Sequence, residues 1–250
     1  YVKLEDAKKQ LEVNTAKEIA NIEKLKTVRD DETKSIEERL KANEEVAKKE
    51  QALSDERVAL QEKVVKNLQE TAAIEEKNGN ISIETKDKLR EAEIELADIQ
   101  NEQAGIRIEA ITNQNNLIKE SADLIRRAGE SEIEIAELKG VSEQKLFDLR
   151  SELIQKQLDD IKAKGGEELA VYKELQQEQI KISLEKKRVQ LDDLNEVIDK
   201  EEERTLLFIE SETEALAIQK KNQQKRLANI QQTLGKESDE YKLWYGNHIA

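Results

Sequence analysis

The chain contains no proline and no cysteine among its 250 residues, and only eight glycines. Proline inside a helix removes a backbone hydrogen bond and clashes with the preceding turn. Its complete absence therefore predicts helix over nearly the whole chain. The absence of cysteine excludes disulfides and thiolate chemistry.

Bulky apolar side chains are also scarce. Aromatic residues make up 3% of the chain and apolar residues 36%, below the roughly 45–50% of globular domains. A compact core needs bulky side chains, whereas a narrow seam between helices needs only Leu, Ile, Val and Ala. Low hydrophobicity with a net charge of −14 is also typical of disorder, but the regular apolar spacing favours helices.

The acidic balance opposes binding to nucleic acid, whose phosphates need clustered Lys and Arg, and to an anionic membrane. The apolar run at residues 206–209 (LLFI) is far too short for a membrane span or a signal-peptide core. We therefore expect no nucleic acid, no membrane in this segment and no small-molecule substrate. Because the chain lacks methionine and opens in helical sequence, we expect a segment of a longer protein.

Helix boundaries can be read from capping residues. Ser35 and Glu38 form a capping box, in which each side chain accepts from the other residue's amide. A second helix should begin there and run to about Lys77, after a first helix and a polar break over residues 1–34. Gly79 can take the left-handed conformation that closes a helix.

The third helix is expected to end near Ala128, and Gly129 and Gly140 to bracket a short element. Apolar and amide residues of this helix follow steps of three and four, with one longer step, and so predict its buried seam. They are Leu89, Ala92, Leu96, Ile99, Gln103, Ile106, Ala110, Asn113, Leu117 and Leu124.

Ser142 is the predicted N-cap of the next helix, which carries Leu146, Leu149, Leu153 and Ile161 and ends at Gly165-Gly166. One long, unbroken helix to about Leu234 should follow. Gly235 should end it, and Ser238 should cap the last helix. The expected seam of the long helix consists of Leu184, Leu191, Ile198, Leu227, Ile230 and Leu234.

Helices that stop at glycine and restart within a few residues usually fold back on their predecessors. We therefore predict an all-α, elongated coiled coil of antiparallel helical hairpins; a kinked but extended rod is the alternative. The expected parts are a first helix and polar break (1–34), a hairpin turning near Gly79 (35–128), a hairpin turning near Gly165 and Gly166 (129–234), and the start of a further helix (235–250).

No motif points to catalysis. His248 is the only histidine, and the residue three positions before it is Tyr245, so the helical di-iron pattern of Glu before each His is missing. We expect His248 to pack with Tyr241 and Trp244 on one helix face. The chain is predicted not to be an enzyme, with no catalytic, cofactor-binding or metal-binding residue and no cofactor.

Acidic runs at residues 30–32 and 201–203 lack the spacing of a calcium loop and are expected to be solvated. Gly235-Lys236 lacks the other residues of a phosphate-binding loop. The amides at residues 113–116, with Gln103 on the same seam, could fix helix register or form a hinge. With Gly105 nearby, we favour a solvent-facing or loosely packed stretch.

Three short stretches of the sequence are similar to those of a known family: RDDETKSIEER at residues 29–39, KANE at residues 41–44, and GIRIEAITNQNNL at residues 105–117. Together they resemble the charged helical regions of tailed-phage tape-measure proteins and related phage-tail structural proteins, over roughly residues 20–130. The resemblance implies a virion tail protein that associates with itself or with other helical proteins of the same assembly. The glycine turns shorten the chain, which fits a tail-associated fibre better than a ruler.

Two other functions are consistent with these patterns. One is the coiled-coil arm of an SMC-type ATPase whose head lies outside this chain. The other is a module whose exposed seam captures partner helices. The mixture of Leu, Ile, Val and Ala in the seams favours no single oligomeric state.

Overall fold

The computed structural model describes the backbone of residues 2–209, 211–236 and 238–248, and the side chains of residues 15–209, 211–236 and 238–246. Helices hold 88% of the described residues, and no strand occurs among them. The all-α class that the absence of proline predicts is therefore confirmed.

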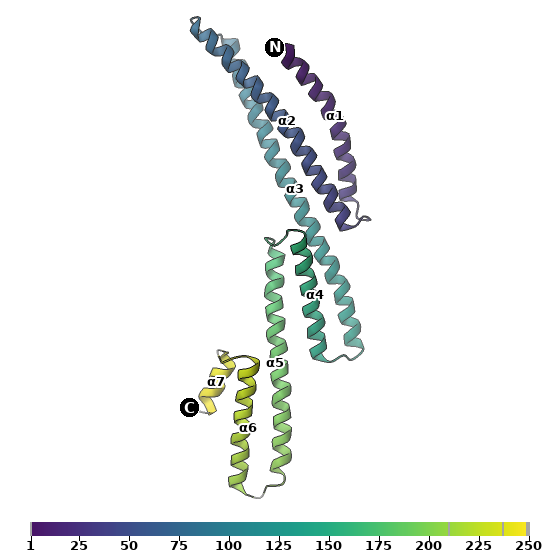
Figure 1. Cartoon of the computed structure of the whole chain (residues 1–250), viewed down its shortest axis with the longest axis vertical. Coiled ribbons are helices and arrows are strands. Elements are labelled where there is room, and N and C mark those ends of the chain that lie inside the picture. Colours follow the sequence, from purple (N-terminus) through teal and green to yellow (C-terminus); the bar gives the residue numbers. More distant parts are fainter. Residues whose placement is uncertain (1, 210, 237, 249–250) are drawn as a thin grey trace. The chain divides into compact units, whose positions relative to one another are not determined.

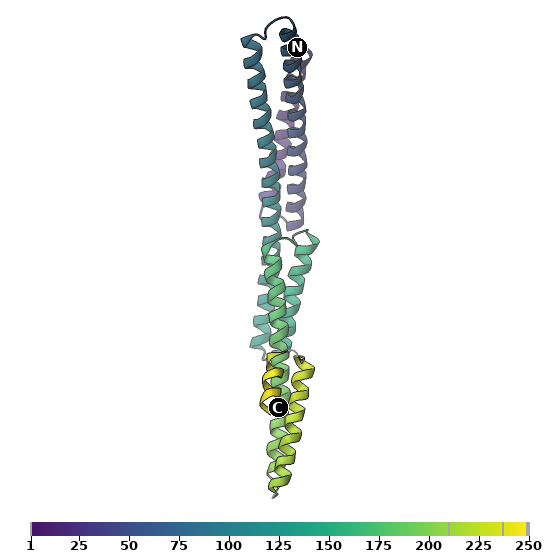
Figure 2. The ribbon, with the colours of Figure 1, turned by 90° about the vertical axis from the view of Figure 1, so that its left-hand side faces the viewer.

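The chain divides into two compact units, Tyr1–Ser121 and Ala122–Ala250. The first contains α1 (Val2–Asp30), α2 (Ile36–Lys77) and the larger part of α3 (Ile83–Leu138). Figures 1 and 2 show these three helices side by side. The second contains the end of α3, α4 (Glu143–Ala163), α5 (Ala170–Leu206), α6 (Glu212–Thr233) and α7 (Asp239–His248).

In the first unit α2 and α3 run in opposite directions. Asn43, near the start of α2, bonds to Ala110 of α3, and Gln61, farther along α2, bonds to the earlier Ala92. An apolar cluster lies between the helices close to their connecting turn. Its members are Val64, Val65, Leu68, Leu89, Ala92 and Leu96.

The seam predicted for α3 matches the buried or half-buried positions from Leu89 to Leu117. Leu124 is an exception, because its side chain is 51% exposed, and Ala122 is buried instead. Ile74, close to the end of α2, is also exposed. The three-and-four spacing therefore locates the buried face along most of the helix but not at its far end.

The helix ends follow the capping residues. Ser35 and Glu38 form both bonds of the predicted capping box at the start of α2. Gly79 has φ +124°, a conformation that costs a residue with a β-carbon, so glycine suits this turn. Ser238 accepts from the amide of Tyr241 at the start of α7. Ser142 precedes α4 as predicted, although its hydroxyl makes no capping bond.

The predicted end of the third helix near Ala128 is wrong, because α3 continues through Gly129 to Leu138. A β-carbon at Gly129 would lie 2.3 Å from Leu153 Cδ1 of α4. The glycine therefore makes room for a close contact between helices. That packing supports a helical position that local propensity disfavours.

The long helix predicted after Gly166 is also interrupted. Helix α5 ends at Leu206 and α6 begins at Glu212, with Ser211 as N-cap. Figures 1 and 2 show α6 lying back along α5. Asp199 near the end of α5 pairs with Arg226 of α6. Leu207 and Phe208 at the turn are 76% and 87% exposed.

The predicted seam of α5 is right at Leu191 and Ile198, which are buried, and wrong at Leu184, which is 49% exposed. Ile182 is buried in its place. The reason is a change of neighbour along α5. Its first half faces α4, where Gln179 bonds to Gln155, and its second half faces α6. A single heptad series cannot describe a helix whose buried face changes.

Candidate functional site

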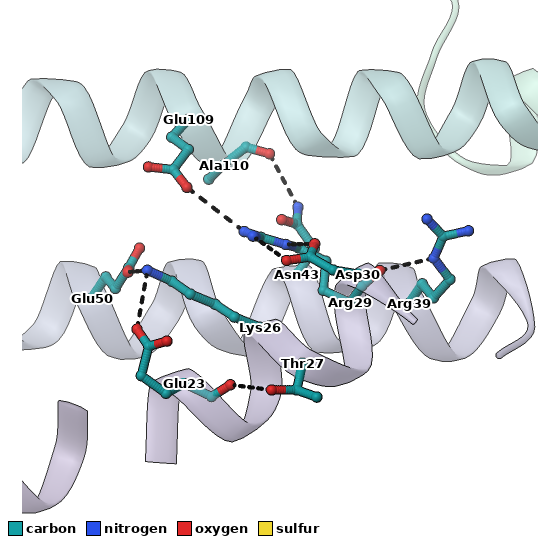
Figure 3. A network of polar contacts seen from close by, with 10 residues as sticks. All are labelled: Glu23, Lys26, Thr27, Arg29, Asp30, Arg39, Asn43, Glu50, Glu109 and Ala110. Atoms are coloured by element: carbon teal, nitrogen blue, oxygen red, sulfur yellow. Dashed lines mark hydrogen bonds and ion pairs between the residues drawn. The ribbon is translucent and has the colours of Figure 1, made fainter. Parts of the chain in front are cut away.

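A polar network of the first unit joins the end of α1, the start of α2 and the middle of α3 (Figure 3). Arg39 of α2 is central to it and is only 7% exposed. Its Nε donates to the main-chain carbonyl of Arg29 at 2.8 Å, and its Nη1 lies 2.5 Å from Glu120 Oε1. One guanidinium thus caps the last turn of α1 and pairs with a carboxylate on α3.

Arg29 and Asp30 form the second part of this junction. The Arg29 guanidinium donates to both carboxylate oxygens of Asp30, at 2.7 and 3.0 Å, and lies 3.8 Å from Glu109. The hydrogen bond from Arg29 lowers the pKa of Asp30 below its ordinary value, and the positive charge of Arg29 adds to the effect. The Asp30 side chain is 63% exposed, as expected for a solvated acidic run, and it also takes part in an ion pair.

Lys26 connects the same end of α1 to α2. Its Nζ lies 2.9 Å from Glu50 Oε1 and 3.8 Å from Glu23 Oε1. The hydrogen bond to Glu50 raises the pKa of Lys26. The same α1–α2 contact continues to Glu18, which pairs with Lys49 at 2.8 Å. These pairs are partly exposed, so each contributes modestly to stability.

Three buried amide side chains share one arrangement. Each donates to the main-chain carbonyl of an alanine on α3, at 3.0–3.1 Å. Asn43, Gln61 and Gln157 are the donors, and each is less than 5% exposed. The acceptors are, in the same order, Ala110, Ala92 and Ala122. The small alanine side chain leaves its helix backbone accessible to an amide from the neighbouring helix.

Such a bond fixes one residue opposite another along two helices. An amide slipped by one turn would lose its acceptor, and an unpaired buried amide costs about 1–3 kcal/mol. Buried amides in helical seams are known to select register in this way. The three bonds therefore fix the register of α2 and of α4 against α3.

A third polar group closes the turn between α2 and α3. Glu75 accepts from the amide of Ser82 and from the hydroxyl of Thr85, each at 2.8 Å. These two bonds, first that of the Ser82 amide, lower the pKa of Glu75. Thr85 is buried, so the carboxylate ties the end of α2 to the first turn of α3.

The residues that the sequence singled out lie elsewhere. Gln103 is half-buried and donates to Asp55 of α2 at 2.5 Å, which makes it a contact between helices. Of the amides at residues 113–116, Asn113 and Asn115 are half-buried and the other two are exposed. Tyr241 stacks on Tyr245 with ring centroids 5.9 Å apart. The side chain of His248 lies outside the described residues.

The second acidic run, at residues 201–203, is likewise used between helices. Glu201 pairs with Lys225 at 3.1 Å, and Glu202 pairs with Arg226 at 3.0 Å. Among the residues that the structure describes, no three metal-binding side chains gather at one point. Nor does any helix in that part of the chain have the length and apolarity needed to cross a membrane.

Sequence reasoning missed Arg39 and the three buried amides that bond to alanine carbonyls of α3. Arg39 follows the capping box by one residue, so its position near the end of the preceding helix could have been found by folding α1 back on α2. The buried amides give a weaker signal. They occupy seam positions of α2 and α4, but glutamine on a helix usually indicates a solvated face.

No family model, curated protein or solved structure matches the chain.

Proposed function

We propose that the chain is a structural scaffold segment, built as a coiled coil of antiparallel helical hairpins, in the tail of a phage. The observation that carries the structural role is the set of three buried amides on α2 and α4, each of which donates to an alanine carbonyl of α3. Asn43 and Gln61 specify register at two points of one helix pair, and Gln157 does so at a third point in the second unit. A chain that fixes register repeatedly holds defined distances along its helices, as a scaffold requires.

The distribution of charge supports the same role. Arg39 and Glu75 are engaged at helix ends, where they hold a carbonyl or a turn. The phage-tail assignment is supported by the resemblance at residues 29–39 and 105–117. The first stretch contains the α1–α2 connection, and the second lies opposite the start of α2.

The experiment compares two substitutions one turn apart on α5, in the parent assembly. Leu191 is 7% exposed and Leu194 is 45% exposed. Leu191→Asp places a carboxylate in the seam and should abolish incorporation of the chain into particles. Leu194→Asp adds the same charge at the surface and should leave incorporation intact.

Electron microscopy of those particles with an antibody against the chain tests the location. Labelling confined to tails is the expected result. A chain missing from purified particles would overturn the phage-tail assignment. Equal incorporation of the two Asp variants would overturn the structural role itself.

A further inference from the structure

Helix α3 carries a second apolar stripe on the face opposite its seam with α2. Ile94, Ile108 and Ile111 are 55%, 66% and 57% exposed. Ala97 and Ala104 continue the stripe at helical spacing and are also exposed. All five residues belong to the first unit. An apolar stripe of this length on a solvated helix indicates an interaction surface.

We propose that this stripe binds the same stripe of a second copy of the chain, with the two α3 helices antiparallel. This inference rests on the proposed scaffold function and specifies how copies of the scaffold associate. In this alignment Ile94 faces Ile111 of the partner subunit, and Ala97 faces the partner's Ile108. The two-fold symmetry repeats each contact, so both copies bury the same surface.

The polar residue within the stripe supports this alignment. Asn101 then faces Ala104 of the partner subunit, an alanine of α3. Within one chain, Asn43, Gln61 and Gln157 each donate to the carbonyl of an alanine on that same helix. In the antiparallel pair, Asn101 can therefore use the main-chain carbonyl of the partner's Ala104 as its acceptor, as these three amides use alanine carbonyls within one chain. A parallel alignment would instead place Asn101 against the partner's Asn101.

Charges beside the stripe favour the antiparallel orientation as well. In a parallel pair Glu93 would lie against the partner's Asp98, and the symmetry would repeat this repulsion. In the antiparallel pair Glu93 lies opposite the partner's Gln114, and Asp98 lies opposite the partner's Gly105. No like charges then meet along the flanks of the stripe. At the ends of the stripe, Arg90 lies opposite the partner's Asn115. These two polar residues mark where the apolar contact ends.

Single cysteines test the orientation cleanly, because the chain has none of its own. Full chains carrying Ile94→Cys and Ile111→Cys are mixed and oxidised. The antiparallel pair brings these positions within disulfide reach, so the mixture should form a cross-linked dimer. Ile94→Cys alone should not cross-link, because two copies of that position would lie about 26 Å apart along the axis at 1.5 Å per residue.

Sedimentation velocity over a concentration series tests the association itself. The unmodified chain should shift from monomer to dimer, and Ile108→Asp should remove the shift. Ile135→Asp is the control, because Ile135 is an exposed isoleucine of α3 outside the stripe, at 51% against 66% for Ile108. This variant should still shift from monomer to dimer. Circular dichroism verifies that both variants are helical.

Cross-linking of Ile94→Cys with itself would show a parallel pair and overturn the proposal. A chain that stays monomeric at every concentration and forms no cross-linked mixture would also overturn it. Either outcome leaves the scaffold proposal standing, because its structural role is tested by the incorporation of Leu191→Asp against Leu194→Asp and its location by the labelling of particles.

Discussion

The side chain of Gln61 on α2 donates from Nε2 to the main-chain carbonyl of Ala92 on α3, at 3.0 Å, with Gln61 only 3% exposed. Ala92 belongs to the apolar cluster between these helices. The bond is therefore shielded from water, and it needs a donor on the side chain of residue 61. A carboxylate at that position would present only acceptors to the carbonyl.

This relationship predicts a pH-dependent defect in Gln61→Glu. Burial raises the pKa of a carboxyl group, so the folded state of the variant binds a proton more tightly than the unfolded state. The variant should approach the parent's stability at low pH, where the protonated carboxyl can donate. Its stability should fall as pH rises above the unfolded value of about 4.3, by several kcal/mol at neutral pH.

Urea unfolding across a pH series measures this difference. Gln69→Glu is the control, because Gln69 lies on the same helix and is exposed. It should follow the parent at every pH. A Gln61→Glu variant whose deficit does not change with pH would show that residue 61 is solvated.

Arg39 should be the most sensitive arginine of the first unit. Arg39→Ala removes both the cap on α1 and the pair with Glu120, and we expect a loss of about 2–3 kcal/mol in the free energy of unfolding. Arg39→Lys should recover only part of it, because one ammonium cannot reproduce the two directed bonds. Arg57→Ala breaks an exposed pair with Glu102 and should cost less than about 1 kcal/mol. Equal losses for Arg39→Ala and Arg57→Ala in urea unfolding would contradict the capping role.

The hydrogen bonds that Glu75 accepts at the α2–α3 turn should be visible in the titration of its carboxyl group. Thr85→Val keeps the shape of the buried side chain and removes the hydroxyl that donates to Glu75. The pKa of Glu75, measured by nuclear magnetic resonance, should lie below its ordinary value in the parent and rise towards it in the variant.

The sign of the linked stability follows from that lowered pKa. The stabilisation is present above the unfolded pKa of Glu75 and is lost as pH falls through the folded pKa. The parent should therefore lose more stability on acidification than Thr85→Val. An unchanged titration of Glu75 in the variant would show that Thr85 does not hold the carboxylate.

Two glycines within α3 should respond oppositely to alanine. Nothing lies within 4 Å of a β-carbon placed at Gly105, so Gly105→Ala should raise stability by about 0.5–1 kcal/mol through helix propensity. At Gly129 the same β-carbon would lie 2.3 Å from Leu153 Cδ1, and displacing Leu153 should cancel or reverse that gain. Thermal unfolding of both variants measures the difference; a gain at Gly129 equal to that at Gly105 would mean that Leu153 moves freely.

The helix class, the capping residues and the seam from Leu89 to Leu117 could all be predicted from the sequence, because proline, serine caps and apolar spacing act locally. The break before Ser211 could not be predicted from glycine or proline, since neither is present there. A weaker signal existed, because Ser211 is followed by Glu212 and Glu214, an acidic first turn.

The candidate site was harder to predict, because it depends on which helices meet. Gln61 and Gln103 are both glutamines at seam spacing, and local sequence does not distinguish the one that is buried against a backbone carbonyl. Ile182 and Leu184 present the same difficulty. Only the change of neighbour along α5 decides which of them is covered.

The order of helix contacts also has a kinetic consequence. Helix α1 packs on α2, α4 on α5, α5 on α6 and α6 on α7, so each of these helices meets its neighbour in sequence. Contacts between segments close in sequence give a low contact order, for which folding in microseconds to milliseconds is typical. Each pair can form as soon as its second helix leaves the ribosome, before later helices are made. The chain would thus spend little time with its apolar seams exposed.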